Sequence, residues 1–240
     1  MMDEPNAIAD TEDFEFAALA EAVNYRAAII HEFKSHLGGR VLEVGAGIGQ
    51  TSEAILRLSG VQDLVAVEPD PRFHEGFRRR LPDTALVGGT TRDLPDGGNF
   101  SSAVLVNVLE HIDDDQAELG RLRQILCATN GHLCILVPAR PEIFSKLDAH
   151  FGHFRRYTRT ELHDKLDLAG FDVISLHYFN LIGYFAWWLR FKVMQKMSFD
   201  ISQVRLFDRV IFPLMYALES RLVRPPIGQS LIAIGRARSL

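Results

Sequence analysis

The chain has 240 residues, 47% of them hydrophobic, and a formal net charge of −5 at neutral pH. This length suits one large domain or two small ones, and the apolar content is enough for a full core, which argues against wholesale disorder. The negative charge argues against a nucleic-acid backbone as the main partner, because that role usually needs a basic face. We therefore expect no nucleic-acid partner.

The N-terminal residues and the cysteines predict a cytoplasmic protein. Residues 1–13 are acidic and polar and lack the basic and apolar regions of a signal peptide. The longest apolar run, 178–189, is too short to span a bilayer. Cys127 and Cys134 belong to no CxxC or Cys/His cluster, so we interpret them as reduced thiols. The acids at 113–115 are interpreted as a solvated helix N-terminus, and no metal site is predicted.

Helical and strand patterns alternate along the chain. After a loose tail over 1–13, apolar residues at helical spacing predict an N-terminal helix over 14–37. Short apolar segments predict strands at 40–45, 64–68, 85–87, 103–108, 133–137, 171–178 and 231–234. Helical patterns lie between them at 51–58, 71–81, 113–126 and 158–170. Apolar strands separated by helices indicate a parallel sheet covered on both faces, and one domain over 1–240 is the simplest arrangement.

An aromatic insertion over residues 181–224 separates the last two predicted strands. Its first part, 181–197, is apolar on nearly all sides until Arg190, and its second part carries one apolar stripe at helical spacing. We favour a helical cap buried on the domain. The alternatives are a homodimer interface and an interfacial membrane foot with basic residues at the headgroups.

A glycine-rich turn joins the first predicted strand to the helix that follows it. The stretch 41–51, VLEVGAGIGQT, has the spacing GxGxG, whereas a dinucleotide-binding loop would have glycine where Gln50 stands. The turn lies at the carboxyl end of the first strand, where open α/β sheets bind ligands. Glu43 precedes the glycines, and a carboxylate there suits an ammonium and a sulfonium better than a pyrophosphate. At the end of the second strand, Glu68 can accept both hydroxyls of a ribose.

Taken in this order, the strand, GxGxG turn, helix, strand and acid resemble a class I S-adenosylmethionine (SAM)-dependent methyltransferase over residues 40–139. In that family the turn packs against SAM and the acid binds its ribose. Together with the pattern of elements, the resemblance predicts an α/β fold with a Rossmann-like, doubly wound, mostly parallel seven-stranded sheet and a C-terminal helical insertion. Residues 152–171 resemble a bacterial subgroup whose members often act on small metabolites or sit beside glycan-assembly genes.

The resemblance also implies which residues bind SAM. Thr90 stands where the family usually places an adenine-binding aspartate, so Thr90 and Thr91 are the candidates for that contact. Asn107 closes the fourth strand beside the methionine portion, and Glu43 helps to hold the methionine end. Tyr25 resembles a subgroup residue near the methyl donor. The predicted cofactor-binding residues are Tyr25, Glu43, Gly45, Ala46, Gly47, Gly49, Glu68, Pro69, Thr90, Thr91 and Asn107.

Two histidines are predicted to act as catalytic bases. His111 follows the fourth strand and His153 follows the fifth, which places both at the catalytic edge of the sheet. A base helps methyl transfer when the acceptor is a hydroxyl, because its proton must leave. Each histidine also has a structural interpretation. In it, His111 stabilises the strand–helix turn, and His153 is a loop residue hydrogen-bonded to its neighbours.

Beside His153, the residues Arg155, Arg156 and Tyr157 are predicted to bind substrate, because arginine grips acidic groups in a forked geometry. The alternative is that Arg156 and Tyr157 brace the helix that follows.

The predicted function is therefore transfer of a methyl group from SAM to a small, partly apolar acceptor, at oxygen. Three alternatives stay open within this framework: methylation at nitrogen or carbon, a lipid-linked glycan as acceptor, and a SAM-binding partner protein without catalysis. An NAD-linked oxidoreductase is disfavoured by the glycine spacing and by the lack of a recognisable Tyr–Lys pair.

Overall fold

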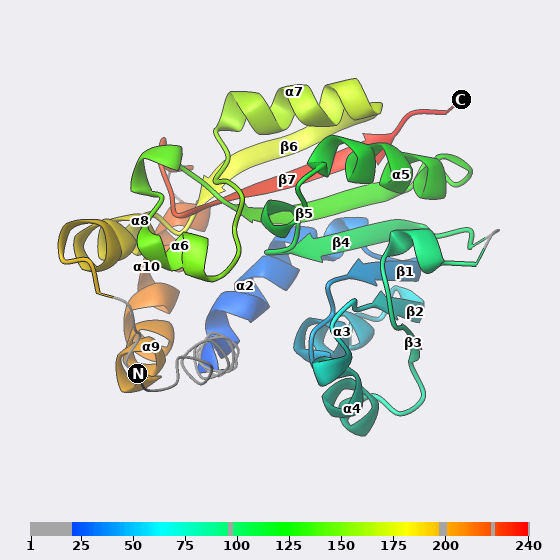
Figure 1. Cartoon of the computed structure of the whole chain (residues 1–240), viewed down its shortest axis with the longest axis horizontal. Coiled ribbons are helices and arrows are strands. Elements are labelled where there is room, and N and C mark those ends of the chain that lie inside the picture. The colour runs from blue at the N-terminus through cyan, green and yellow to red at the C-terminus, as the bar shows by residue number, and fades with distance from the viewer. Residues whose placement is uncertain (1–20, 96–97, 197–200, 222–223, 240) are drawn as a thin grey trace, which may run out of the picture.

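The computed structural model describes residues 21–95, 98–196, 201–221 and 224–239. They form one sheet with the strand order β3-β2-β1-β4-β5-β7-β6, in which β7 runs antiparallel to both of its neighbours and the other pairs are parallel (Figure 1). The predicted mostly parallel, doubly wound sheet is confirmed. The strands are β1 (Gly39–Val44), β2 (Val61–Val67), β3 (Ala85–Val87), β4 (Ser102–Val106), β5 (His132–Pro138), β6 (Phe171–Phe179) and β7 (Ser230–Ala237).

Helices cover both faces of this sheet (Figure 1). On one face lie α5 (Asp115–Cys127) and α7 (Arg159–Ala169), and on the other lie α2 (Val23–Phe33), α3 (Gln50–Leu56) and α4 (Pro71–Arg80). The strand order reverses between β1 and β4, so the carboxyl ends of these two strands open a crevice at the switch point. This crevice is the position that the sequence predicts for the ligand.

Successive strand side chains contribute to two separate hydrophobic cores. In β5, Leu133 and Ile135 belong to the core beneath α5 and α7, while Cys134 and Leu136 belong to the core beneath α2 and α3. All four side chains are fully buried. A strand covered on both faces has no polar side, which is why the predicted strand 133–137 is apolar throughout.

Some elements differ from the prediction. The helix predicted from residue 14 begins at Val23 in the described part of the chain, and its residues 14–20, like the tail 1–13, lie outside that part. After β5 the chain forms two short helices that have no periodic signal, because a single turn is too short to show one. The short helical turns are η1 (Lys34–His36), η2 (Thr91–Asp93), η3 (Leu109–His111), η4 (Pro141–Ile143) and α6 (Lys146–His150).

The aromatic insertion forms a group of helices at one edge of the molecule, on the left in Figure 1. On its inner side, Trp187, Phe191 and Phe212 are buried. A helical cap packed on the domain would bury this side. Among the residues described, no helix combines the length and the apolarity needed to cross a membrane. The insertion comprises α8 (Leu181–Trp187), the π-helical turn η5 (Trp188–Val193), α9 (Ile201–Leu206), a second π-helical turn η6 (Phe207–Ile211) and α10 (Phe212–Arg221).

A buried carboxylate joins the insertion to the N-terminal helix. Asp208, in η6, accepts hydrogen bonds from the backbone N–H groups of Asn24 at 3.0 Å and Tyr25 at 2.8 Å. It also accepts one from the side chain of Asn24. The first N–H groups of a helix have no partner within the helix, so an acid from a distant segment satisfies them here. The contact fixes the position of Tyr25 relative to the insertion.

We expect Asp208→Ala to lower the free energy of unfolding by roughly 1–2 kcal/mol, because it leaves partly buried N–H donors at the start of α2 without their acceptor. Denaturant titration followed by circular dichroism measures this change. The control is Asp164→Ala, whose side chain is 71% exposed. If both variants unfold like the wild type, Asp208 does not hold α2.

Candidate active site

The predicted glycine turn approaches its neighbours closely at two positions. Gly45 has a φ of +73°, and a Cβ placed on it would lie 2.3 Å from Val108 Cγ2. Gly49 has a φ of +81°, and a Cβ there would lie 3.0 Å from Phe77 in α4. Both positions therefore require glycine, for backbone conformation and for space. Gly45 lets the end of β1 lie against the segment after β4, and Gly49 lets α3 start against α4.

Glu68 ties the turn to the end of β2. Its Oε2 accepts a hydrogen bond from the N–H of Gly47 at 2.7 Å, and its Oε1 accepts one from the N–H of Asp70 at 2.9 Å. Burial raises the pKa of Glu68 above its ordinary value, although both backbone bonds oppose the shift. Each carboxylate oxygen can accept a further hydrogen bond, so a diol such as ribose fits the remaining lone pairs.

A cavity of about 790 Å³ opens over this turn. Its volume is within the range of cofactor sites. The wall includes Arg26 and Glu118, which the sequence analysis did not single out. The predicted cofactor residues that line it are Tyr25, Gly45, Ala46, Gly47, Glu68, Pro69, Thr90, Thr91 and Asn107.

Thr90 and Thr91 form the part of the wall where adenine is predicted to bind. The Thr90 hydroxyl and N–H both donate to Asp93, and the Thr91 hydroxyl donates to Glu118 at 3.0 Å. The bonds to Asp93 cap η2, and the bond to Glu118 holds η2 against α5. The segment is therefore fixed in place before any ligand binds.

Two predicted cofactor residues, Glu43 and Gly49, are not part of the cavity wall. Gly49 packs against α4, as described above. Glu43 is 3% exposed and accepts a hydrogen bond from the Ser52 hydroxyl beneath the turn. Burial raises the pKa of Glu43 to about 8, and the charge of Glu68 adds to the shift. The side chain is therefore largely a neutral acid at pH 7 when the cavity holds no cation.

A second cavity, of about 370 Å³, adjoins the first. Both cavities are lined by Tyr25, Asn107 and Phe151, together with Ala22. Asn107 has a φ of +53°, in the left-handed region that asparagine tolerates better than most residues. The rest of the second wall includes His153, Arg156, Asn180, Trp187, Phe191, Phe207, Asp208, Gln229 and Ser230. Most of these residues come from the insertion and from segments far apart in the sequence, so spacing alone could not group them.

His153 and Arg156 are held by one buried carboxylate. Asp148 accepts hydrogen bonds from Nδ1 of His153 at 3.2 Å and from Nε of Arg156 at 2.7 Å. Burial opposes the ionisation of Asp148, yet the bond from His153 and the charge of Arg156 keep its pKa below the ordinary value. An ionised carboxylate only accepts, so Nδ1 carries the proton and Nε2 of a neutral His153 holds the lone pair. That Nε2 is buried and has no hydrogen-bond partner in the described part of the chain.

His111 lies against His153. The two rings meet edge to face with centroids 4.7 Å apart. His111 is exposed on the side of the first cavity, but desolvation of its packed side and the neighbouring imidazole lower its pKa to about 4. It is therefore neutral at pH 7. The ligand atoms of Glu110, His111 and His153 lie within 4.8 Å of one another, a donor set of the kind that can hold a metal ion.

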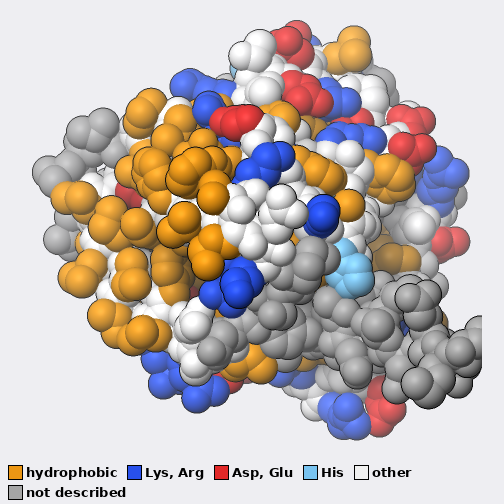
Figure 2. Space-filling view, turned by 60° about the vertical axis from the view of Figure 1, so that its left-hand side comes forward, with side chains coloured by type: hydrophobic (Ala, Val, Ile, Leu, Met, Phe, Trp, Pro, Cys, Tyr) orange, Lys and Arg blue, Asp and Glu red, His pale blue; other side chains and the backbone are white. Residues whose placement is uncertain are grey.

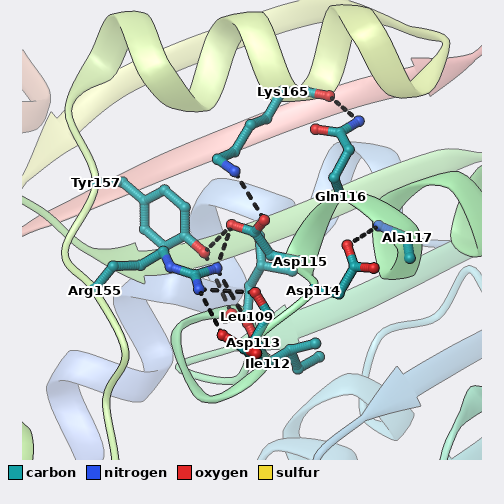
Figure 3. A network of polar contacts seen from close by, with 10 residues as sticks. All are labelled: Leu109, Ile112, Asp113, Asp114, Asp115, Gln116, Ala117, Arg155, Tyr157 and Lys165. Atoms are coloured by element: carbon teal, nitrogen blue, oxygen red, sulfur yellow. Dashed lines mark hydrogen bonds and ion pairs between the residues drawn. The ribbon is translucent and has the colours of Figure 1, made fainter.

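Arg155 and Tyr157 point away from both cavities. Figure 3 shows them converging on Asp115 at the start of α5, together with Lys165 of α7. Tyr157 donates its hydroxyl to Asp115 at 2.8 Å, Arg155 lies 2.9 Å from the same carboxylate, and Lys165 donates at 2.8 Å. Of the three predicted substrate-binding residues, the structure places Arg156 at a cavity and the other two in a brace between helices.

Replacing Glu43 with glutamine should flatten the pH dependence of stability. The folded chain keeps this carboxyl protonated up to about pH 8, whereas the unfolded chain ionises it near its ordinary pKa of 4.5. Between these values the folded state binds more protons, so the free energy of unfolding falls as the pH rises, by up to about 1.4 kcal/mol per pH unit.

Thermal unfolding measured from about pH 5 to pH 8 tests this expectation. The wild-type midpoint should fall more steeply than that of Glu43→Gln, and the control Glu75→Gln, whose side chain is 79% exposed, should follow the wild type. Equal slopes for all three proteins would show that Glu43 ionises normally in the fold.

Comparison with known proteins agrees with this geometry. A methyltransferase-domain family model matches residues 13–176, which is more than half of the chain. An uncharacterized methyltransferase from Mycobacterium tuberculosis is 32% identical over 87 residues, which are 36% of this chain and 35% of that protein. The matched part thus spans about a third of the relative's length.

Solved structures share the fold at low sequence identity. A chain from a complex of a methyltransferase activator with a methyltransferase of Haloferax volcanii superposes with a TM-score of 0.63 at 15% identity, over 98% of this chain and 99% of that one. A SAM-dependent methyltransferase from Archaeoglobus fulgidus gives 0.54 at 17% identity, over 88% and 92%. At such identities the structural likeness shows the fold alone, and the family match carries the assignment. The chain belongs to the class I SAM-dependent methyltransferases.

Proposed function

We propose that this protein transfers a methyl group from SAM to a hydroxyl oxygen of a small, partly apolar acceptor in the second cavity. One observation carries the proposal: the two cavities share the wall formed by Tyr25, Asn107 and Phe151. Methyl transfer from a sulfonium is an in-line displacement, so donor and acceptor must meet end to end. Two adjoining cavities that share lining residues support a proposal of this kind.

The first cavity is assigned to SAM. In this proposal Glu68 accepts the ribose hydroxyls, Thr90 and Thr91 lie beside the adenine, and Asn107 lies beside the methionine portion. Tyr25 stands where the cavities meet, and burial raises its pKa to about 12, so its ring is that of a neutral phenol. An aromatic ring attracts a neighbouring cation, which suits a sulfonium. Glu43 lies beneath the turn and acts on the methionine end from there.

The second cavity is assigned to the acceptor. Much of its wall is apolar, formed by Trp187, Phe191 and Phe207. Its basic side chains are Arg156 and Arg190. The guanidinium of Arg156 is paired with Asp148 at 2.7 Å and lies 4.6 Å from the ring centroid of Trp187. Asp148 balances the charge of Arg156, so this guanidinium offers a polar contact to an acceptor rather than an unbalanced positive charge. Arg155 and Tyr157 act through Asp115, as positioning residues for the loop.

His153 is the proposed base. Asp148 fixes the proton on Nδ1, which leaves the Nε2 lone pair for the proton of the acceptor hydroxyl. The ring of His111 packs against that of His153 and is neutral, so it places no positive charge beside the proposed base. In the proposed step, oxygen of the acceptor bonds to the methyl carbon, the carbon–sulfur bond breaks, and His153 takes the hydroxyl proton.

Calorimetric titration with SAM and, separately, with NAD tests the cofactor. We expect the wild type to bind SAM and not NAD, and Glu68→Ala to weaken SAM binding at least tenfold through lost ribose contacts, on the order of 1.4 kcal/mol or more. Glu75→Ala is the matched control, since its side chain is 79% exposed. Binding of NAD alone would overturn the proposal and leave the fold.

Steady-state kinetics tests the base, once a screen has found an acceptor. We expect His153→Ala to lower kcat by about 10²–10⁴-fold while SAM affinity stays unchanged. His163→Ala, on the exposed surface of α7, is the control. An unchanged rate would show that the acceptor needs no base, as for an amine nitrogen with a lone pair. A protein that binds SAM but turns over no acceptor would instead be a non-catalytic partner.

A further inference from the structure

The outer side of the insertion carries a large apolar surface, which we call the apolar face. Most of the large hydrophobic side chains that are exposed in the described part of the chain belong to the insertion. Figure 2 shows a broad orange area on this side of the molecule. Elsewhere such side chains are scattered singly, as at Leu168 and Ile174. The apolar face consists of Phe185, Trp188, Leu189, Val193, Met194, Ile201, Leu206, Val210, Ile211, Leu214 and Leu218.

The helices below this face are apolar on two sides. In α8 and η5, Trp187 is 8% exposed while its neighbour Trp188 is 45% exposed. In the second half of the insertion, Phe212 is 2% exposed while Leu214 is 71% exposed. A surface helix of a globular protein normally turns polar residues to solvent, and apolar patches of this extent mark contact with a partner or a membrane. Packing within this chain accounts for the apolar residues on the inner side of these helices. It does not account for those on the outer side.

The insertion also has a charge opposite to that of the rest of the chain. Residues 181–224 contain seven basic and three acidic residues, a balance of +4 within a chain of −5, so the remainder carries −9. Two of the three acids are turned inward: Asp208 accepts from backbone N–H groups of α2, and Glu219 accepts from those of Asn180 and Leu181.

The basic side chains, by contrast, lie at the surface. Lys192, Lys196 and Arg209 are exposed, whereas the exposed Arg205 is paired with Glu21 at 2.9 Å. Figure 2 shows basic side chains bordering the apolar area. The outer surface of the insertion is therefore apolar and positively charged.

We propose that the apolar face docks on an anionic lipid membrane. Interfacial helices bury apolar side chains at the boundary of the acyl region and place lysine and arginine among the phosphates, and this face presents both groups. A second copy of the chain would bring two surfaces of the same charge together, which opposes dimerisation through this face. Since no described helix can span the bilayer, the contact lies in the interface.

The same helices form the wall of the proposed acceptor cavity. Trp187, Phe191 and Phe207 line that cavity from the inner side, while Trp188, Leu189 and Leu206 lie on the apolar face. Docking therefore places the cavity next to the bilayer, where an amphipathic acceptor is dissolved. This consequence rests on the proposed function, whereas docking itself needs neither SAM nor turnover.

Flotation of the full chain with vesicles tests the docking. Vesicles of phosphatidylcholine mixed with phosphatidylglycerol should carry the wild type, and vesicles of phosphatidylcholine alone should carry much less. We expect Trp188→Ser and Leu214→Ser each to weaken the partition on the order of tenfold. Lys196→Gln and Arg209→Gln should each weaken it about fivefold, an effect that added salt removes. The matched control Leu168→Ser with Ile174→Ser removes exposed apolar side chains outside the face and should partition like the wild type.

Tryptophan fluorescence gives an independent signal, because Trp187 and Trp188 are the two tryptophans of the sequence. Anionic vesicles should shift the emission of Trp187→Phe, which keeps Trp188, to shorter wavelength. They should leave the emission of Trp188→Phe nearly unchanged. A wild type that stays unbound to anionic vesicles overturns the proposal. A dimer in solution that Trp188→Ser dissociates, without vesicle binding, assigns the face to a second copy instead. The SAM titration is unaffected by either result, so failure of docking and failure of the proposed function can be told apart.

Discussion

The hydrogen bond from the N–H of Gly47 to Glu68 joins the two parts of the molecule that must meet to make a cofactor site. It spans 2.7 Å between the turn after β1 and the end of β2. The N–H groups of Gly45 and Ala46 bond to the carbonyl of Val67 across the same gap. Because Gly45 also lies against Val108, the ends of β1, β2 and β4 meet at this one turn. The cavity opens over this turn, and Gly45, Ala46 and Gly47 are part of its wall.

The fold and the donor side of the site follow from local sequence signals. The positive φ of Gly45 is a local requirement that a strand, a turn and a helix in succession already imply, whereas its contact with Val108 is not. Glu68 follows at the next strand end. Thr158 likewise begins α7, where its hydroxyl accepts from the N–H of Glu161 at 3.1 Å. Such features depend on neighbours in the chain, so spacing is enough to find them. Burial of Glu43 beneath the turn, by contrast, depends on Ser52 and the helix above it.

The acceptor side could not be predicted in the same way, and the segment 155–157 shows the reason. Successive side chains of an extended segment point to opposite sides. Arg155 and Tyr157 therefore turn together toward Asp115, while Arg156 turns to Asp148. The sequence groups the three residues, but only the positions of two distant carboxylates decide which of them faces a cavity. For the same reason the pairing of His111 with His153 depends on how the loop after β5 folds.

The insertion forms both part of the wall of the proposed acceptor cavity and the apolar face. The guanidinium carbon of Arg156 lies 4.6 Å from the ring centroid of Trp187. Asp208 holds the start of α2, and Tyr25 in that helix lines both cavities. Asp208 and Glu219 both accept from backbone N–H groups on the inner side of the insertion, so neither carboxylate lies beside the exposed lysines of its outer side. Asp208 is part of the wall of the second cavity, and Glu219 holds the start of α8 through the N–H groups of Asn180 and Leu181. A partner bound to the apolar face would contact the same helices that line the proposed acceptor cavity.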